Sequence, residues 1–229
     1  MCGRYAITSP PEALRSLFGY VDEPDFPPRY NIAPTQPVPV VRLGESAPGG
    51  SPRRFVLMRW GFIPSFVKDP REFALIINAR AETAPERSSF RAALARRRCI
   101  FIADAFYLWQ AGPKPKRAYM VRRLDASPFG MAGLWECWSS PDGGEIDTAC
   151  ILTTSANGTL AAISERMPVI LDPPAYDTWL DCRNVRVQAA MRLAQPAPDE
   201  TLERVEIGDA VNRVANDGPF VQAPLTRRY

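Results

Sequence analysis

The sequence predicts an α+β fold, a single compact domain in which a few helices flank a curved, mostly antiparallel, β-barrel-like sheet. Short apolar segments of strand length recur along the chain, whereas helix start signals are few. The chain has 229 residues, of which 46% are hydrophobic, and this is enough to bury a core. It contains no internal repeat, low-complexity tract or clear linker, so we expect residues 1–229 to form one domain.

Helices are expected where capping signals precede apolar residues. Ser9-Pro10-Pro11-Glu12 combines an N-cap serine, a proline at the first helical position and a capping-box glutamate, and Gly19 ends this helix. The Pro-rich segment from Pro24 to Pro39 cannot be helical, because proline lacks the amide hydrogen and restricts the residue before it. The expected helices cover residues 9–18, 88–95, 172–180 and 184–193.

Strands are expected where apolar runs are bounded by turn residues. Val38 to Leu43 is such a run, and Phe55 to Trp60 returns as its partner after a Gly-rich loop. The other expected strands cover residues 73–77, 99–103, 106–110, 118–122, 131–138, 148–154 and 202–207. Many short strands with few helices favour the α+β class over a doubly wound fold.

The composition excludes several kinds of active site. The chain has no histidine, which excludes Ser-His-Asp and Cys-His catalysis and any metal site with histidine ligands. Its five cysteines form no CxxC pair, so we expect neither zinc nor a disulfide framework, and no cofactor. A net charge of +3 excludes a grossly basic tail. No run approaches the length of a membrane span, and we expect a cytoplasmic protein.

The most reactive group in the sequence is Cys2. Removal of Met1 would leave Cys2 as a 1,2-aminothiol, whose amine and thiol have unperturbed pKa values of about 7.7–8.0 and about 8.5. Both nucleophiles would then be partly available at neutral pH. Such a group condenses with an aldehyde, first as a Schiff base and then as a five-membered thiazolidine ring. The alternative is that Cys2 is an ordinary small buried residue.

Five stretches together resemble the SRAP family, the SOS-response-associated peptidase-like proteins, and their order and spacing are also those of the family. They are Met1-Cys2-Gly3-Arg4-Tyr5, Arg29-Tyr30-Asn31-Ile32-Ala33-Pro34-Thr35, Arg59-Trp60-Gly61-Phe62-Ile63-Pro64, Asn78-Ala79-Arg80-Ala81-Glu82-Thr83 and Arg166-Met167-Pro168-Val169-Ile170-Leu171. The resemblance implies a monomer that binds single-stranded or gapped DNA and reacts with the ring-opened aldehyde of an abasic site through an N-terminal cysteine. The fold it implies is a compact α+β domain around a β-barrel-like sheet.

The resemblance also implies roles for individual residues. Cys2 matches the nucleophile and Asn78 the active-site asparagine, while Arg80 and Arg4 match or neighbour phosphate-binding positions. The remaining DNA-binding positions are Trp60 and Phe66, as an apolar wedge beside the lesion, and Arg166 and Met167, in a loop flanking the site. Core packing is the alternative for Trp60 and Met167. A salt bridge with Glu82 or Asp104 is the alternative for Arg80.

Two positions depart from the family pattern. Leu108 in Tyr107-Leu108-Trp109 replaces a glutamate, and Ser164 replaces a histidine. Both missing groups are the family's acid–base residues, and each such group contributes typically about 10²–10⁴-fold. Cross-linking should therefore be slow or altered, because leucine transfers no proton and serine is a poor acid. Asp104, Glu136 and Glu165 are candidate replacement carboxylates.

Two other classes of function stay open. One is a non-covalent binder of single-stranded DNA, which would tolerate Cys2→Ala. The other is a thiol peptidase, which needs a base for the thiol and an oxyanion hole. For either DNA-binding class we expect a basic face that includes Arg4, Arg80 and part of Arg96-Arg97-Arg98. A solvated helix end stabilised by the helix dipole is the alternative for the arginine triplet.

Overall fold

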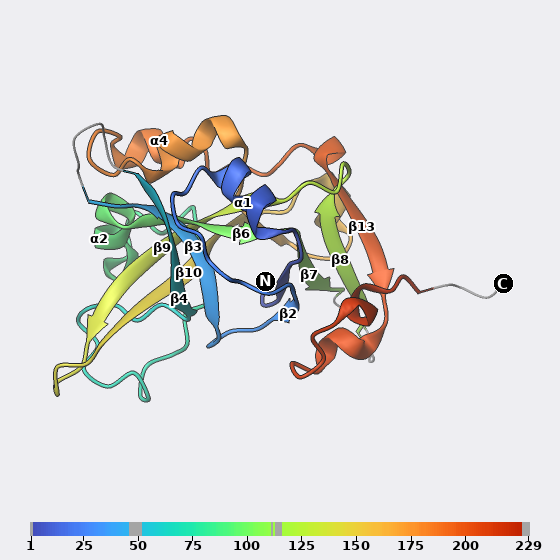
Figure 1. Cartoon of the computed structure of the whole chain (residues 1–229), viewed down its shortest axis with the longest axis horizontal. Coiled ribbons are helices and arrows are strands. Elements are labelled where there is room, and N and C mark those ends of the chain that lie inside the picture. The colour runs from blue at the N-terminus through green and yellow to red at the C-terminus, as the bar shows by residue number, and fades with distance from the viewer. Residues whose placement is uncertain (1, 46–51, 111, 113–115, 226–229) are drawn as a thin grey trace.

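The structure is a computed structural model that describes residues 2–45, 52–110, 112 and 116–225, and the statements below concern this part of the chain. It contains two sheets with short helices at their edges (Figure 1). The strands are β1 (Tyr5–Ile7), β2 (Arg29–Ile32), β3 (Pro37–Leu43), β4 (Arg53–Trp60), β5 (Asn78–Arg80), β6 (Arg98–Ala103), β7 (Ala105–Trp109), β8 (Ala118–Arg123), β9 (Phe129–Ser139), β10 (Glu145–Ser155), β11 (Arg166–Pro168), β12 (Ile170–Leu171) and β13 (Leu202–Ile207). The α-helices are α1 (Pro11–Phe18), α2 (Ser88–Arg96), α3 (Gly158–Ala161), α4 (Tyr176–Leu180) and α5 (Val187–Met191), and the 3₁₀-helices are η1 (Pro173–Ala175), η2 (Asp199–Thr201), η3 (Asp209–Asn212) and η4 (Pro219–Gln222).

The larger sheet closes on itself. Its strands pair in the order β11-β10-β4-β3-β6-β9-β12, and β9 also pairs with β10, so that β10, β4, β3, β6 and β9 form a continuous ring. Among the described strands, only the pairings of β10 with β4 and with β5 are parallel. This confirms the prediction of a curved, mostly antiparallel sheet with few helices. The expected pairing of β3 with β4 is also confirmed.

The smaller sheet carries the N-terminal strand. Its order is β13-β8-β7-β1-β2, so β1 lies between β7 and β2. Tyr5 of β1 faces into the main core, where its ring meets those of Trp60 and Phe101 edge-on at centroid distances of 5.3 Å and 6.3 Å. Such edge-to-face contacts are a favoured geometry for aromatic pairs. They fix the segment that leads back to Cys2 against the larger sheet.

The first helix ends as predicted but begins differently. Gly19 has a φ of 66°, the left-handed conformation that glycine adopts at little cost, and its amide donates to the carbonyl of Arg15. The predicted N-cap role of Ser9 is wrong, because Pro10 holds that position and no side chain caps the helix. The Ser9 hydroxyl instead donates to Asp104, whose carboxylate also accepts from the amides of Thr8 and Ser9.

Two further predictions were wrong or too long. The strand expected at 73–77 is not formed apart from a single bridge between Phe62 and Ile76, and β5 begins only at Asn78. The helix expected at 184–193 is limited to α5, because the Asp181 carboxylate accepts from the amides of Arg183 and Asn184 and turns the chain there. The helix expected at 172–180 begins as the 3₁₀ turn η1 and continues as α4.

Arg98 is a buried structural residue. It is 1% exposed, and its guanidinium donates to the carbonyls of Leu94, Trp179, Asp181 and Val185. The carbonyls of Leu94, Trp179 and Asp181 lie at the ends of α2 and α4, where helices leave acceptors without partners, and that of Val185 lies in the turn after α4. Arg98 therefore does not belong to the expected basic face.

No helix in the described ranges is long and apolar enough to cross a membrane.

Candidate functional site

Cys2 and Asn78 meet at the edge of the larger sheet. The Asn78 side chain donates from Nδ2 to the carbonyl oxygen of Cys2 at 2.9 Å. Asn78 begins β5, which pairs in parallel with β10 through Asn78 opposite Ile151. The sheet thus fixes Asn78, and Asn78 in turn fixes the backbone of Cys2. The two residues that the sequence predicted as catalytic are brought together.

Asn78 also borders a surface hollow of about 290 Å³. The hollow is lined by Leu75, Ile76, Ile77, Asn78, Arg80, Thr83, Arg87, Ser89, Phe90, Thr153 and Arg166. Two buried polar atoms here have no hydrogen-bond partner, the Oδ1 of Asn78 and the Nε of Arg166. A buried acceptor or donor left unpaired is costly. The hollow is therefore suited to a ligand that offers both a hydrogen-bond donor and an acceptor.

Arg80 is an exposed cation at the wall of this hollow. Its side chain is exposed and makes no hydrogen bond or ion pair with the described residues. The salt bridge considered for it is not formed, because Glu82 is engaged by Arg166 and Asp104 by the start of α1. The Arg166 guanidinium also holds the pKa of the Glu82 carboxyl below its usual value. The Arg80 guanidinium is therefore available to bind a phosphate, as predicted from the sequence, although this contact stays a prediction.

Arg166 and Arg4 have structural partners. Arg166 binds both Glu82 oxygens at 2.7 Å and 2.9 Å and the carbonyl of Thr153 at 2.6 Å. Arg4 donates to the Oδ1 of Asn31 at 2.9 Å and to the carbonyl of Val211 at 2.7 Å, and burial lowers its pKa. Contacts of Arg166 and Arg4 with DNA stay predictions, and either arginine would have to bind DNA while keeping these hydrogen bonds.

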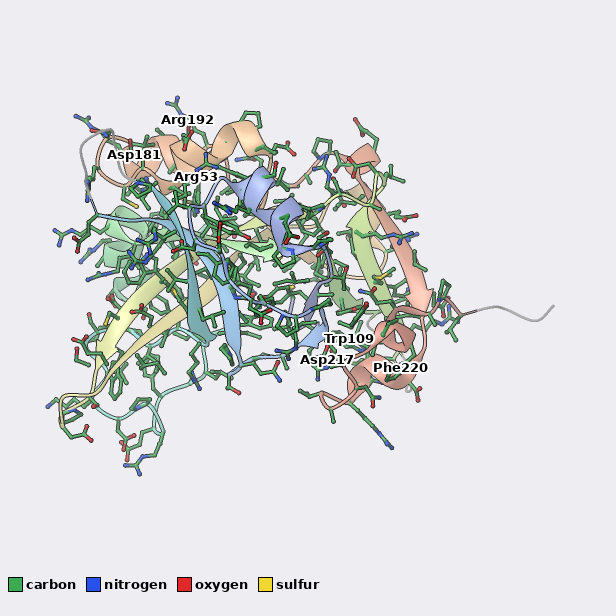
Figure 2. All side chains as sticks on the ribbon, in the orientation of Figure 1. Arg53, Trp109, Asp181, Arg192, Asp217 and Phe220 are labelled. Carbon is green, nitrogen blue, oxygen red and sulfur yellow. The ribbon has the colours of Figure 1, made fainter. Side chains whose placement is uncertain are left out.

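Asn31 is a residue whose role the sequence analysis missed. It is fully buried, and its Nδ2 donates to three carbonyls of the C-terminal segment, those of Val211, Arg213 and Asn216. This C-terminal segment does not line the hollow. Its Asn212 accepts a hydrogen bond through Oδ1 from the indole Nε1 of Trp109. Figure 2 labels Trp109 together with Asp217 and Phe220 of the C-terminal segment. In the sequence, the only indication of this role is that Asn31 is a polar residue within the Pro-rich segment.

Core packing describes Trp60 and Met167. Both are fully buried, and the Trp60 indole donates to the carbonyl of Ile77 at 3.0 Å. Neither presents a surface to a base in this structure. Phe66, in contrast, is 58% exposed and meets the Phe73 ring edge-on at 6.3 Å. Of the predicted wedge, Phe66 is thus the member that is open to a ligand.

Leu108 and Ser164 supply no obvious acid. Leu108 is 1% exposed in the main core, and continuing the pairing of Tyr5 with Phe106 puts it opposite Gly3, next to Cys2. The Ser164 hydroxyl donates to the carbonyl of Arg166 at 2.7 Å and accepts from the amide of the same residue. The two positions at which the family pattern has an acid and a base therefore carry the apolar side chain of Leu108 and the Ser164 hydroxyl, which is hydrogen-bonded within its own loop.

Two of the three candidate replacement carboxylates are occupied elsewhere. Asp104 holds the residues that precede α1, as described above. Glu136 is 4% exposed and pairs with Arg97 at 3.2 Å, and burial raises its pKa. Glu165 is exposed in the loop before β11, and its side chain makes no hydrogen bond or ion pair with the described part of the chain. Glu165 is the one of the three that is free to move.

Burial controls the ionisation of the Cys2 thiol. It is fully buried, its Sγ lies 3.7 Å from the carbonyl oxygen of Arg4, and burial raises its pKa to about 12. With Met1 in place the Cys2 thiol is therefore protonated at neutral pH, and the expectation of a partly ionised thiol, which concerns the Met1-processed chain, stays a prediction. The physical cause is desolvation, which disfavours the thiolate. Within the described ranges, no group of three or more Cys, Asp and Glu side chains is placed to hold a metal ion.

Comparison with known proteins gives the same assignment across nearly the whole chain. The family model "SOS response associated peptidase (SRAP)" matches residues 1–214. The abasic site processing protein YoqW of Bacillus subtilis is 34% identical over 223 residues, covering 96% of this chain and 97% of that protein. The abasic site processing protein HMCES of Mus musculus is 32% identical over 270 residues, covering 98% of this chain and 76% of that protein.

Solved structures share the fold. A crystal structure of a Bacteroides thetaiotaomicron protein has a TM-score of 0.86 at 22% identity and covers 98% of this chain and all of its own. A Bordetella bronchiseptica protein has a TM-score of 0.77 at 26% identity, covering 90% of this chain and all of its own. With the family model and the relatives above 30% identity, these findings agree with the resemblance found in the sequence. The chain belongs to the SOS response associated peptidase (SRAP) family.

Proposed function

We propose that this protein processes abasic sites in DNA, and that it captures the aldehyde of a single-stranded abasic site covalently through Cys2. In this proposal it acts in the cytoplasm as a monomer on single-stranded or gapped DNA. The names of its relatives, abasic site processing proteins, support the substrate. The observation that carries the proposal is the 2.9 Å hydrogen bond from Asn78 to the Cys2 carbonyl, because it joins the nucleophile to the wall of the hollow.

The hollow has the polarity of a sugar flanked by phosphate. The unpartnered Oδ1 of Asn78 accepts a hydrogen bond, as from a sugar hydroxyl or a protonated amine. The unpartnered Nε of Arg166 and the free guanidinium of Arg80 donate, as to phosphate or hydroxyl oxygens. An opened abasic sugar offers both kinds of group next to its aldehyde.

The proposed reaction balances without an external reagent. After Met1 is removed, the α-amine of Cys2 adds to the aldehyde carbon, and loss of one water gives the Schiff base. The thiol sulfur then bonds to the imine carbon, and the thiol proton passes to the nitrogen, which closes the thiazolidine ring. The carbonyl oxygen leaves as water, and no group is oxidised or reduced.

The same residues support a slow reaction. In the Met1-containing chain burial raises the pKa of the Cys2 thiol to about 12, and a buried, protonated thiol in the processed chain would leave the amine to attack first. Leu108 and Ser164 stand where the family has its acid and base, which removes help worth about 10²–10⁴-fold per group. The reaction then depends on proximity, which alone can be worth about 7–11 kcal/mol when the reacting groups are well placed.

The burial of Cys2 favours a second candidate. A thiol with no exposed surface is poorly placed for attack, as in a protein that only binds single-stranded DNA non-covalently. In this case Arg80 and the hollow retain their role and Cys2 becomes a packing residue. The two candidates differ in one property, the dependence of a covalent product on the Cys2 aminothiol.

Denaturing gel electrophoresis separates the candidates. The Met1-processed protein is incubated with an abasic single-stranded oligonucleotide, beside Cys2→Ala and a chain with an N-terminal extension, in which the Cys2 amine is part of a peptide bond. A shifted band from the unaltered protein that both controls lack supports covalent capture. Retention of the oligonucleotide on a native gel without any such band supports the non-covalent binder.

A further inference from the structure

The exposed face of α2 carries arginines without acidic partners. Arg87, Arg91 and Arg96 are exposed and make no side-chain hydrogen bond or ion pair with the described residues. Arginines elsewhere on the surface are commonly paired, as Arg54 is with Asp22 and Arg71 with Asp69. Arg186 and Arg192, at the ends of α5, are likewise exposed without a side-chain partner among the described residues, so α2 differs in carrying three such arginines on one helix that starts at the candidate site.

These arginines connect two hollows. Arg87, at the start of α2, lines the hollow of Asn78 and Arg80. Arg96, at its end, lines another hollow of about 210 Å³, where the Nε of Arg42 is buried without a hydrogen-bond partner. The nine residues of α2 give the helix a length of about 13.5 Å, and the two hollows lie at its two ends. Arg96 lies about 140° around the helix axis from Arg91, so the positive charge crosses the exposed side of α2 obliquely from the candidate site toward the second hollow.

The charge at the start of α2 is unfavourable for the helix dipole. Its N-cap is Arg87, no side chain caps it, and its first turn contains no acidic residue. Helix N-termini carry partial positive charge and are stabilised by anions, so an arginine is an unfavourable choice there unless an anion binds. Departures from such local rules are expected where they serve a function.

Negative charge near this face is limited. Glu82 is engaged by Arg166, and Glu136 is buried against Arg97. Glu86 is exposed and directly precedes Arg87 in the chain. The surface therefore keeps an excess of positive charge that suits a polyanion.

We propose that the DNA strand leaving the hollow runs along the exposed face of α2, with its phosphates held by Arg87, Arg91 and Arg96. This inference rests on the proposed function, because it takes abasic single-stranded DNA as the ligand of the hollow. The track accounts for the basic excess of α2. It makes affinity depend on the length of DNA beside the lesion.

The test measures the fluorescence anisotropy of an undamaged single-stranded oligonucleotide of about 16 nucleotides. The variant is Arg91→Ala/Arg96→Ala. The matched control is Arg186→Ala/Arg192→Ala, which removes two exposed arginines from the ends of α5 and changes the net charge equally.

We expect the affinity of the α2 variant to fall about tenfold at low salt, with a salt slope shallower by about 1.4 for two lost phosphate contacts. The control should keep the affinity and slope of the unaltered protein. A smaller loss is expected for an oligonucleotide of about 4 nucleotides, which is too short to fill both the hollow and the track. Equal losses in variant and control, or no loss in either, would overturn the proposal.

Two further readouts keep the result unambiguous. A loss confined to duplex DNA, with single-strand affinity unchanged, would overturn the assignment of a single strand to α2. Because the oligonucleotide is undamaged, the binding result does not depend on Cys2 chemistry. The covalent band on abasic DNA decides the proposed function separately, so either claim can fail while the other stands.

Discussion

Asn78 donates a hydrogen bond of 2.9 Å to the carbonyl of Cys2, a residue 76 positions earlier in the chain. The bond uses one half of the Asn78 amide, and the other half, the Oδ1, is buried without a partner beside Arg80. One side chain thereby orients the backbone of Cys2, the proposed nucleophile, and keeps an acceptor for a ligand.

Replacing Asn78 should slow capture more than it weakens binding. Asn78→Ala removes the bond to Cys2 and the free acceptor, and we expect the single-turnover rate of covalent product to fall about tenfold, as for loss of one hydrogen bond of about 1.4 kcal/mol. Asn78→Asp should be slower still, because an ionised carboxylate cannot donate to the carbonyl and repels phosphate. An unchanged rate in both variants would show that Asn78 has no part in orienting Cys2.

The buried thiol should respond to pH in a characteristic way. In an N-terminally extended chain, the pKa of about 12 keeps the Cys2 thiol protonated, so alkylation by iodoacetamide should rise about tenfold per pH unit from pH 7 to pH 10. An unperturbed thiol would level off above about pH 8.5. Peptide mass mapping separates Cys2 from the half-buried Cys137 and Cys182. A plateau for Cys2 near pH 8.5 would contradict the burial described.

Restoring the two family residues should accelerate capture. Leu108→Glu/Ser164→His returns a carboxyl beside Cys2 and an imidazole in the loop before β11, and we expect a gain of at least about 10²-fold in the rate of covalent product. Each single variant should give less, because the two groups act on different proton transfers. Thermal unfolding of each variant serves as the control, since Leu108 is buried in the core. A folded double variant with no gain would refute the explanation of slow capture.

Arg98 should be a stability residue rather than a DNA ligand. Arg98→Met leaves four buried or half-buried carbonyls without their donor, and we expect a loss of at least about 3 kcal/mol in the free energy of unfolding. Arg96→Met, two residues away on the exposed face of α2, should change it by less than about 0.5 kcal/mol. Urea unfolding measures both, and similar values for the two variants would contradict the structural role.

The regular elements were largely predictable from local chemistry. Apolar runs on either side of a Gly-rich loop predicted β3 and β4 as partners, and the left-handed Gly19 ends α1 where expected. β13 was predicted with its observed ends, Leu202 and Ile207. These features depend on residues close in sequence, where propensity and pattern act directly. The family resemblance added Asn78, which no local pattern marks as a partner of Cys2.

The failures arose from contacts between distant residues. The Ser9 hydroxyl donates a hydrogen bond to Asp104, 95 positions later in the chain, so the expected capping box did not form. Arg98 was part of an arginine run that suggested a solvated helix end, but carbonyls of α4 and its following turn enclose it. The Cys2 thiol became fully buried through packing between two sheets, and this changed its pKa. Sequence spacing carries no signal for such enclosure.

The most direct test of the central claim is the intact mass of the Met1-processed protein after incubation with an abasic single-stranded oligonucleotide. The account predicts an adduct equal to the two masses minus one water, present in the unaltered protein and missing in Cys2→Ala. Resistance of this adduct to hydride reduction would identify the closed thiazolidine rather than the open Schiff base. No adduct, or an adduct of equal yield in Cys2→Ala, would contradict covalent capture through Cys2.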